Sequence, residues 1–381
     1  MFSSTIRLMK SLACTLVVIL TACNPSQIVA QEITDERTGI RVVLFSPADV
    51  EPPPAAVENI RKAMQYTEKF FEEEFSRWNY EVARKQIFAR EETGEMLVME
   101  IKGDEPATSE KYQSSALLKE LWPKAVEKYT LPKMMPVWWV WVYLGDPPTR
   151  FSGYRGSGDL NRGGWALVNF ENRGGELLLD KEMAFSYNEE FTLKGCIHEF
   201  GHGLGLPHLG PRVKDRAGNS LMGPRTVVFN KSGAAIEHRV YLSQASAAML
   251  SRHFVFTGST KDRNLIPPVA VNNFSAKFIR SSMEIMVTGQ LESNYPAHSV
   301  IVIDEAEPKQ VDYWRKAYVA SLDESNKFRV VVNEPTGLSG TLRLLFCFEN
   351  GAVTSDGKTY STKSGWEKKY RFQGYQFKIE D

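Results

Sequence analysis

The stretch Cys196-Ile-His-Glu-Phe-Gly-His-Gly-Leu-Gly-Leu-Pro-His-Leu-Gly210 contains the pattern H-E-x-x-H-x-x-G-x-x-H. Its first two histidines, His198 and His202, are four positions apart, so on a helix they lie one turn apart on the same face. Two imidazoles placed in this way can bind one metal ion. Glu199 is rotated by about 100° from His198 on a helix. Its carboxylate is therefore expected beside the metal, where a base acting on metal-bound water would lie.

The residues that follow explain how a third ligand arrives. Gly205 readily adopts the left-handed conformation that ends a helix, and Pro207 cannot continue one. The chain is therefore expected to turn sharply, so that His208 reaches the same metal. Three neutral imidazoles leave one zinc position open for water, which is typical of a catalytic site. A helix with a purely structural role is the alternative, but each of its glycines would cost about 1 kcal/mol relative to alanine.

This pattern, with Ser220-Leu221-Met222-Gly223-Pro224 after it, resembles the extended signature of the metzincin clan of zinc peptidases. The second segment is similar to the Leu-Met-Tyr-Pro turn of matrixins, with Gly223 in place of the tyrosine. The resemblance implies that Met222 lies beneath the metal as an apolar floor; an ordinary core methionine is the alternative. It also implies one catalytic Zn²⁺; because the histidines that bind a structural zinc in matrixins are missing here, no second zinc is predicted. Some metzincins use a tyrosine from this turn to support the oxyanion, and neither Gly223 nor Pro224 can do so.

For residues 39–258 the resemblance implies a metzincin-like α/β (α+β) catalytic domain with a twisted mixed sheet. Runs at 40–45, 96–101 and 137–144 read as strands, and the last is almost continuously apolar, as expected for a strand covered on both faces. Helical patterns alternate with these runs, which favours a mixed α/β domain. A helix is predicted at 109–128, interrupted at Pro123.

A helix is also predicted after Pro54, with one buried stripe. The stripe consists of Val57, Ile60, Met64, Phe71, Phe75 and Trp78. Glu72-Glu73-Glu74 is expected to form its solvated face.

A glycine-rich segment, 153–175, contains a strand run at 164–170. In metzincins the strand at this place is a sheet edge that pairs with the substrate backbone. The resemblance therefore implies that Trp165, Ala166, Leu167 and Val168 bind substrate. A Ca²⁺ loop around Asp159 is conceivable, but no ligand pattern supports it.

The N-terminus is typical of an export signal, since Arg7 and Lys10 precede an apolar stretch too short to span a bilayer. Leu20-Thr21-Ala22-Cys23 resembles the lipobox of bacterial lipoproteins, which implies cleavage before Cys23 and acylation of its thiol. The chain is then a cell-envelope lipoprotein held on the membrane by lipid. Plain secretion, with cleavage near Ala30, is the alternative.

Beyond Leu265-Ile266-Pro267-Pro268, short alternating runs follow one another, with turn signals at Asn350-Gly351 and Asp356-Gly357. They predict a small all-β sandwich domain of immunoglobulin-like type. The expected organisation is a signal peptide at 1–22, a lipid-anchored tether at 23–38, the catalytic domain at 39–258 and the β-sandwich at 265–381.

Composition limits the partners. The 381 residues are 43% hydrophobic, enough for two domains with cores. Basic and acidic residues number 46 each, so the chain has no excess of positive charge that would indicate nucleic-acid binding. A monomer acting on a protein or peptide is expected. Cys196 and Cys347 read as small buried hydrophobes, although a disulfide between them is possible in an exported protein.

The sequence thus leads to two hypotheses. The first is a zinc metalloendopeptidase (EC 3.4.24), in which Glu199 is the general base for zinc-activated water. The second is a surface binding lipoprotein whose β-domain binds a protein or glycan while the metal-binding domain is not catalytic.

Overall fold

The structure is a computed structural model of the chain. It describes residues 39–129, 137–145, 151–160, 162–170, 193–224, 239–308, 312–358, 365–373 and 376–380, and only the backbone at 228–229 and 235–237. The predicted signal peptide, Cys23 and the tether lie outside the described residues, so their roles stay predictions. Within the described part, no helix is both long enough and apolar enough to cross a membrane.

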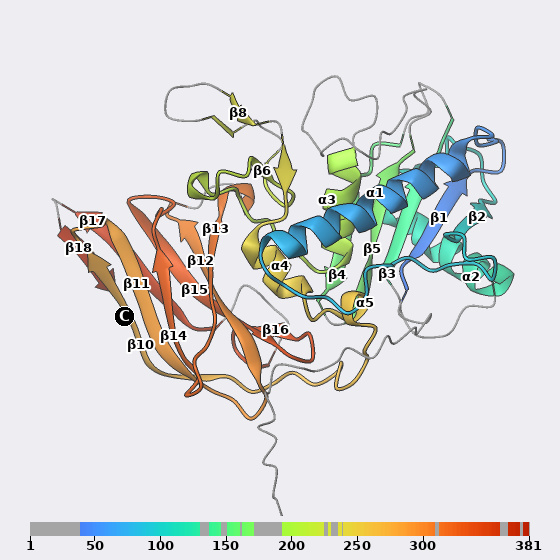
Figure 1. The fold of residues 1–381 in the computed structure, drawn as a ribbon. Helices are drawn as coiled ribbons and strands as arrows, with labels where there is room; N and C mark the ends of the chain where they lie inside the picture. The colour runs from blue at the N-terminus through green and yellow to red at the C-terminus, as the bar shows by residue number, and fades with distance from the viewer. Residues whose placement is uncertain are drawn as a thin grey trace, which may run out of the picture. The chain divides into compact units, whose positions relative to one another are not determined.

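The first part of the chain forms a five-stranded mixed sheet with the order β2-β1-β3-β5-β4 (Figure 1). Four strands run parallel: β1 (Arg41–Ser46), β2 (Val98–Lys102), β3 (Val137–Val142) and β5 (Gly163–Asn169). β4 (Arg155–Asp159) is antiparallel to β5 and forms the edge of the sheet. The mixed α/β fold class predicted for this part is confirmed.

β5 is not the edge strand that was predicted. Trp165 is in register with Trp138 of β3 on one side and with Ser157 of β4 on the other. The prediction that Trp165, Ala166, Leu167 and Val168 form a free edge is therefore wrong. The strand that covers it has the sequence Arg-Gly-Ser-Gly-Asp, with no apolar alternation, and the sequence pattern did not distinguish it from a loop.

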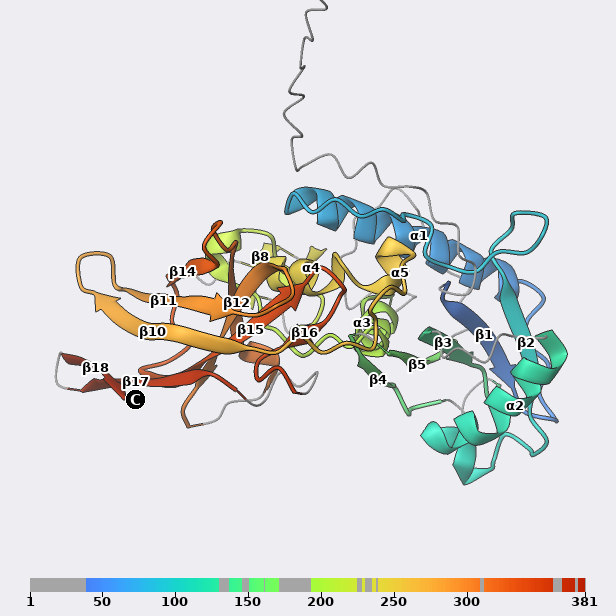
Figure 2. The same ribbon diagram turned by 90° about the horizontal axis from the view of Figure 1, so that it is seen from below.

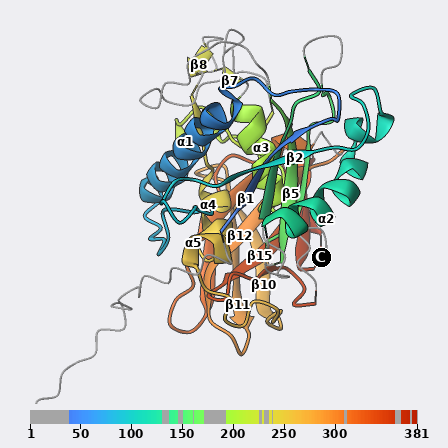
Figure 3. The ribbon, with the colours of Figure 1, turned by 90° about the vertical axis from the view of Figure 1, so that its right-hand side faces the viewer.

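Helices cover both faces of this sheet. α1 (Ala56–Arg77) and α3 (Leu193–Gly203) share one hydrophobic cluster with its first face, and α2 (Leu118–Tyr129) shares a second cluster with the other. Figures 2 and 3 show α1 and α2 on opposite sides of the strands. β3 contributes Trp139 and Trp141 to the first cluster and Trp138 and Val140 to the second. This confirms the prediction of a strand buried on both faces.

Two local predictions need correction. Glu74 does not lie on a solvated face: it is 4% exposed, and its Oε2 accepts a hydrogen bond from the Leu242 amide at 3.0 Å. Its Oε1 accepts another from Arg77 Nε at 3.0 Å. A partner far along the chain explains this buried carboxylate, and no local pattern indicates it. The predicted interruption at Pro123 does not occur, because α2 continues through that residue.

Shorter elements lie among these strands and helices, between the mixed sheet and the C-terminal part, and within the C-terminal part. They are η2 (Glu110–Gln113), η3 (Ser115–Leu117), η4 (Val213–Asp215), β6 (Asn219–Ser220), β7 (Val228–Phe229), β8 (Ala235–Glu237), β9 (Val240–Tyr241), α4 (Gln244–Leu250), α5 (Phe254–Thr257) and η5 (Asp312–Trp314). Ser243 caps α4, since its side chain accepts a hydrogen bond from the Ser246 amide at 3.2 Å.

The C-terminal part consists of antiparallel sheets. One contains β10 (Ala270–Ile279), β11 (Glu284–Glu292) and β14 (Lys327–Val332). The other contains β12 (Ala297–Ala306), β13 (Lys316–Ala320), β15 (Ser339–Phe348), β16 (Val353–Thr354), β17 (Glu367–Gln373) and β18 (Gln376–Glu380). One hydrophobic cluster takes residues from both sheets. The predicted all-β architecture is confirmed, and its immunoglobulin-like type stays a prediction.

The two parts of the chain also share buried residues. Ile301 and Ile303 of β12 and Leu345 of β15 belong to the same cluster as the apolar residues of α1 and α3. Cys196 and Cys347 are both buried in that cluster and are not joined to each other, so the possible disulfide is absent. The boundary predicted near residues 258–265 stays a prediction.

Candidate metal centre

The helix that bears the motif, α3, lies with its backbone directly on the sheet. A Cβ at Gly156 would overlap the carbonyl oxygen of Glu199, and one at Gly158 would overlap that of Gly203. These glycines of β4 allow helix and strand backbones to touch. On the same helix, the Phe200 ring stacks on Trp139 of β3 with centroids 5.0 Å apart. The position of α3 is therefore set by a backbone contact and an aromatic contact together.

The turn after α3 has the geometry that its sequence predicts. Gly205 has φ +88°, in the left-handed region, and a Cβ there would overlap the backbone of Leu160. The Leu206 amide donates to the Gly201 carbonyl and the Gly205 amide to the His202 carbonyl, each at 2.9 Å. This pair of bonds is a Schellman motif, which ends the helix and reverses the chain.

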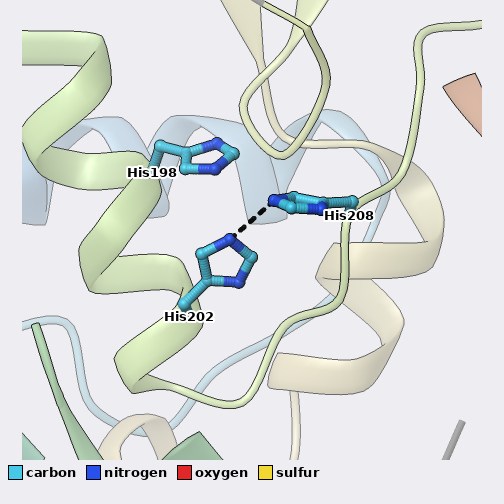
Figure 4. A group of neighbouring side chains, drawn as sticks. All are labelled: His198, His202 and His208. Atoms are coloured by element: carbon cyan, nitrogen blue, oxygen red, sulfur yellow. Dashed lines mark hydrogen bonds between the residues drawn. The ribbon is translucent and has the colours of Figure 1, made fainter. Parts of the chain in front are cut away.

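The reversal brings the three motif histidines together. One ligand nitrogen from each of His198, His202 and His208 lies within 4.8 Å of the other two. Figure 4 shows His198 and His202 projecting from α3 and His208 approaching from the opposite side. The Nε2 atoms of His202 and His208 are 2.9 Å apart. Among the described residues, this is the only group of three or more possible ligands that could hold a metal ion.

Backbone carbonyls orient two of these rings. Nδ1 of His198 lies 2.8 Å from the Leu221 carbonyl oxygen, and Nδ1 of His202 lies 2.8 Å from that of Leu206. A carbonyl oxygen can only accept, so Nδ1 holds the proton and Nε2 of the neutral ring presents a lone pair. Metal-binding histidines commonly have this carbonyl partner. The donor set therefore fits a borderline metal such as zinc.

Burial keeps the three rings neutral. Burial, followed by the neighbouring His202, lowers the pKa of His198 from 6.5 to about 3. Burial, followed by His202 and Arg315, lowers the pKa of His208 to about 4. The pKa of His202 is also lowered, mainly by burial. Neutral imidazole is the form that binds metal.

Met222 lies against α3 at Gly201, and its role as an apolar floor beneath the metal stays a prediction. It is buried, and a Cβ added to Gly201 would come within 2.6 Å of its Sδ. Its carbonyl accepts a hydrogen bond from the Leu209 amide at 3.2 Å. The segment Leu221–Met222 therefore contacts α3 through both residues. It also contacts the loop that carries His208, through the hydrogen bond from Leu209.

The other predicted residues are placed as follows. Glu199 lies on α3 between the first two ligands and is half-buried. Ala166, Leu167 and Val168 are fully buried in the sheet. Asp159 is at the end of β4, and a Ca²⁺ loop around it stays untested.

Sequence reasoning missed a contact from the C-terminal part. The Tyr313 ring lies 3.8 Å from the His208 ring and 5.8 Å from the His198 ring, measured between centroids. Arg315 Nη2 donates to the His208 carbonyl at 3.2 Å. These residues lie more than a hundred positions from the motif, and nothing in the sequence around them indicates a metal site.

Comparison with known proteins shows the fold. No protein family model and no curated protein matches the chain. Among solved structures, catalytically inactive OgpA from Akkermansia muciniphila, in complex with an O-glycopeptide (glycodrosocin) substrate, matches with a TM-score of 0.63 and 18% identity. The match covers 90% of this chain and 95% of that one.

Wild-type OgpA from the same organism matches in two crystal forms. One has a TM-score of 0.63, with 18% identity over 91% of this chain and 95% of that chain. The other has a TM-score of 0.62, with 18% identity over 91% and 96%. At this identity the likeness shows a shared fold, which extends over both the mixed sheet and the antiparallel sheets.

The lowered pKa values predict how metal affinity depends on pH. Protons compete with a metal only below the pKa of its ligands, so we expect zinc affinity to change little between about pH 7 and pH 5.5. If the imidazoles had an ordinary pKa of 6.5, zinc affinity would fall about tenfold for each ligand with every pH unit below that value. Competition with a chromophoric chelator, corrected for the chelator's own protonation, measures this. A steep fall in zinc affinity that begins near pH 6.5 would contradict the lowered pKa values of the three histidines.

Proposed function

We propose that this chain is a zinc-dependent endopeptidase. The observation that supports this most strongly is the convergence of three neutral imidazoles, two of them oriented by carbonyls so that Nε2 presents a lone pair. Three protein ligands leave one tetrahedral position for water or substrate. Glu199 follows the first ligand directly on the same helix. This arrangement suits hydrolysis better than a structural metal site.

The chemistry follows from the residues around that position. When bound, zinc lowers the pKa of its water to about 7 and polarises the scissile carbonyl. Glu199 takes the proton of the attacking water and then gives it to the leaving amine. The carbonyls of Leu221 and Leu206 hold the His198 and His202 rings in place while this occurs.

β4 offers a place for the substrate backbone. It is the sheet edge, and Gly156 on it contacts the backbone of Glu199 and Cβ of His202. An extended peptide that adds to this edge gains main-chain hydrogen bonds and lies beside the ligands. We therefore propose β4 (Arg155–Asp159), and not Trp165–Val168, as the strand that pairs with substrate.

The substrate class we propose is an O-glycosylated peptide. OgpA, which shares the fold over 90% of this chain, is known in complex with an O-glycopeptide substrate. The shared fold includes the antiparallel sheets from which Tyr313 reaches the metal centre. This substrate class is a narrower proposal than peptide hydrolysis and is tested separately.

Replacing the base tests the mechanism. In Glu199→Gln the side chain keeps its size but cannot take a proton, so we expect kcat/KM to fall by about 10³-fold while zinc content is unchanged. Cleavage of a peptide library, followed by mass spectrometry, and metal analysis measure the two effects. Glu110→Gln, on the exposed face of η2, is the matched control.

A chelator should also abolish cleavage by the wild-type protein, and added zinc should restore it. A Glu199→Gln protein that cleaves at the wild-type rate would rule out the proposed mechanism. Absence of any chelator-sensitive cleavage would favour the binding lipoprotein instead.

The substrate class is tested with two peptides of identical sequence, one with a single O-linked sugar on serine or threonine. We expect kcat/KM to be at least about tenfold higher for the glycopeptide, because polar groups built to bind sugar hydroxyls stay unpaired without them. Equal rates for the two peptides would refute the O-glycopeptide proposal and leave the peptidase proposal intact.

We also propose, from the sequence of residues 1–23, that the protein is exported and anchored through an acylated Cys23. Expression in a bacterial host with labelled palmitate should label the full-length protein, and Cys23→Ser should abolish the label. Labelling that survives this substitution, or a wild-type protein found only in the soluble fraction, would exclude the anchor.

A further inference from the structure

The third metal ligand is held differently from the first two. His198 and His202 lie on α3, and each donates from Nδ1 to a backbone carbonyl. His208 lies on the loop after Pro207, beyond the end of that helix. Within the described part of the chain, His208 has no such carbonyl bond at Nδ1. Another group must therefore orient its ring.

A segment between β12 and β13 supplies that group. The face of Tyr313 packs on His208 with ring centroids 3.8 Å apart and planes 31° apart. The same ring lies 5.8 Å from His198, at 29°. Tyr313 thus packs against His208 and lies near His198. It limits how far the His208 ring can rotate away from the metal position.

Arg315 fixes the backbone of the same loop. Its Nη2 donates to the His208 carbonyl at 3.2 Å, and its own carbonyl accepts from the Gly210 amide at 2.6 Å. These two bonds hold the loop on both sides of Leu209. Arg315 is itself buried, and its Nε donates to the Asp312 carbonyl at 3.3 Å.

We propose that Tyr313 and Arg315 are positioning residues for the third metal ligand, so that the C-terminal β-structure is a constituent of the metal centre. The inference rests on the proposed metal site. Tyr313 acts through its ring face, which sets the orientation of His208, and Arg315 acts through the loop backbone. The β-structure is then needed to assemble the site, whatever else it binds.

The test measures zinc binding by the full chain, without reference to activity. Outer groups that orient a metal ligand typically account for about 10- to 100-fold in affinity. We expect Tyr313→Ala to weaken zinc binding by about that factor, and Tyr313→Phe, which keeps the ring, to restore it to within about threefold of wild type. Trp314→Ala is the matched control, because Trp314 is the next residue but is 38% exposed.

Cobalt substitution provides a second readout that a loss of stability alone would not change. The visible d–d bands of bound Co²⁺ report ligand geometry, so Tyr313→Ala should alter them while Tyr313→Phe and Trp314→Ala keep the wild-type spectrum. Thermal unfolding of each metal-free variant checks that it is folded. Because Tyr313 is only half-buried, its truncation is expected to leave the fold intact.

Three outcomes would overturn the inference. They are zinc binding by Tyr313→Ala as tight as that of wild type, a loss of affinity in Tyr313→Phe as large as that in Tyr313→Ala, and a loss in Trp314→Ala as large as either. A wild-type protein that binds no zinc would instead contradict the proposed metal centre itself.

Discussion

The backbone of α3 closely approaches the backbone of strands β4 and β5 at glycine positions, and the geometry of the site depends on this contact. Gly156, Gly158 and Gly164 in the strands, with Gly203 in the helix, make it possible, because a Cβ at any of the strand positions would overlap backbone atoms. Glycine inside a helix or strand costs about 0.5–1 kcal/mol relative to alanine. The contact places the His198–His202 face beside the sheet edge, which is where an extended substrate could pair.

A chain of neighbouring contacts then builds the metal centre outward from that helix. Met222 packs beneath Gly201, and the Leu221 carbonyl orients His198. The Schellman turn at Gly205 returns the chain so that His208 faces His202. These contacts join residues at most 23 positions apart in the sequence. The final contact, from Tyr313 onto His208, comes from a different sheet.

The features that the sequence predicted correctly are those set by local patterns, such as residue spacing and apolar runs. The spacing of His198, His202 and His208 implies one helix face and one turn, and the structure brings these rings together. The apolar run at 137–144 predicts a buried strand, since every side chain of β3 is covered. β4 was missed because its Arg-Gly-Ser-Gly-Asp sequence has neither apolar alternation nor β-branched residues. Its place at the edge follows from its pairing with β5, which is visible only in three dimensions.

Long-range contacts explain the other failures. Glu74 lies in a run of glutamates, and only its hydrogen bond to Leu242 reveals that it is buried. Tyr313 lies in a short segment between strands, and only the packing of the two parts of the chain brings it to His208. The shared cluster containing Ile301 and Leu345 fixes that packing.

The central claim is that three imidazoles converge on one ion. Anomalous diffraction at the zinc absorption edge, from crystals grown with zinc, tests it most directly. The account predicts one strong peak about 2.0–2.1 Å from a ring nitrogen of each of His198, His202 and His208, with a fourth position filled by water. A peak bound by other residues, or none between these three rings, would contradict it.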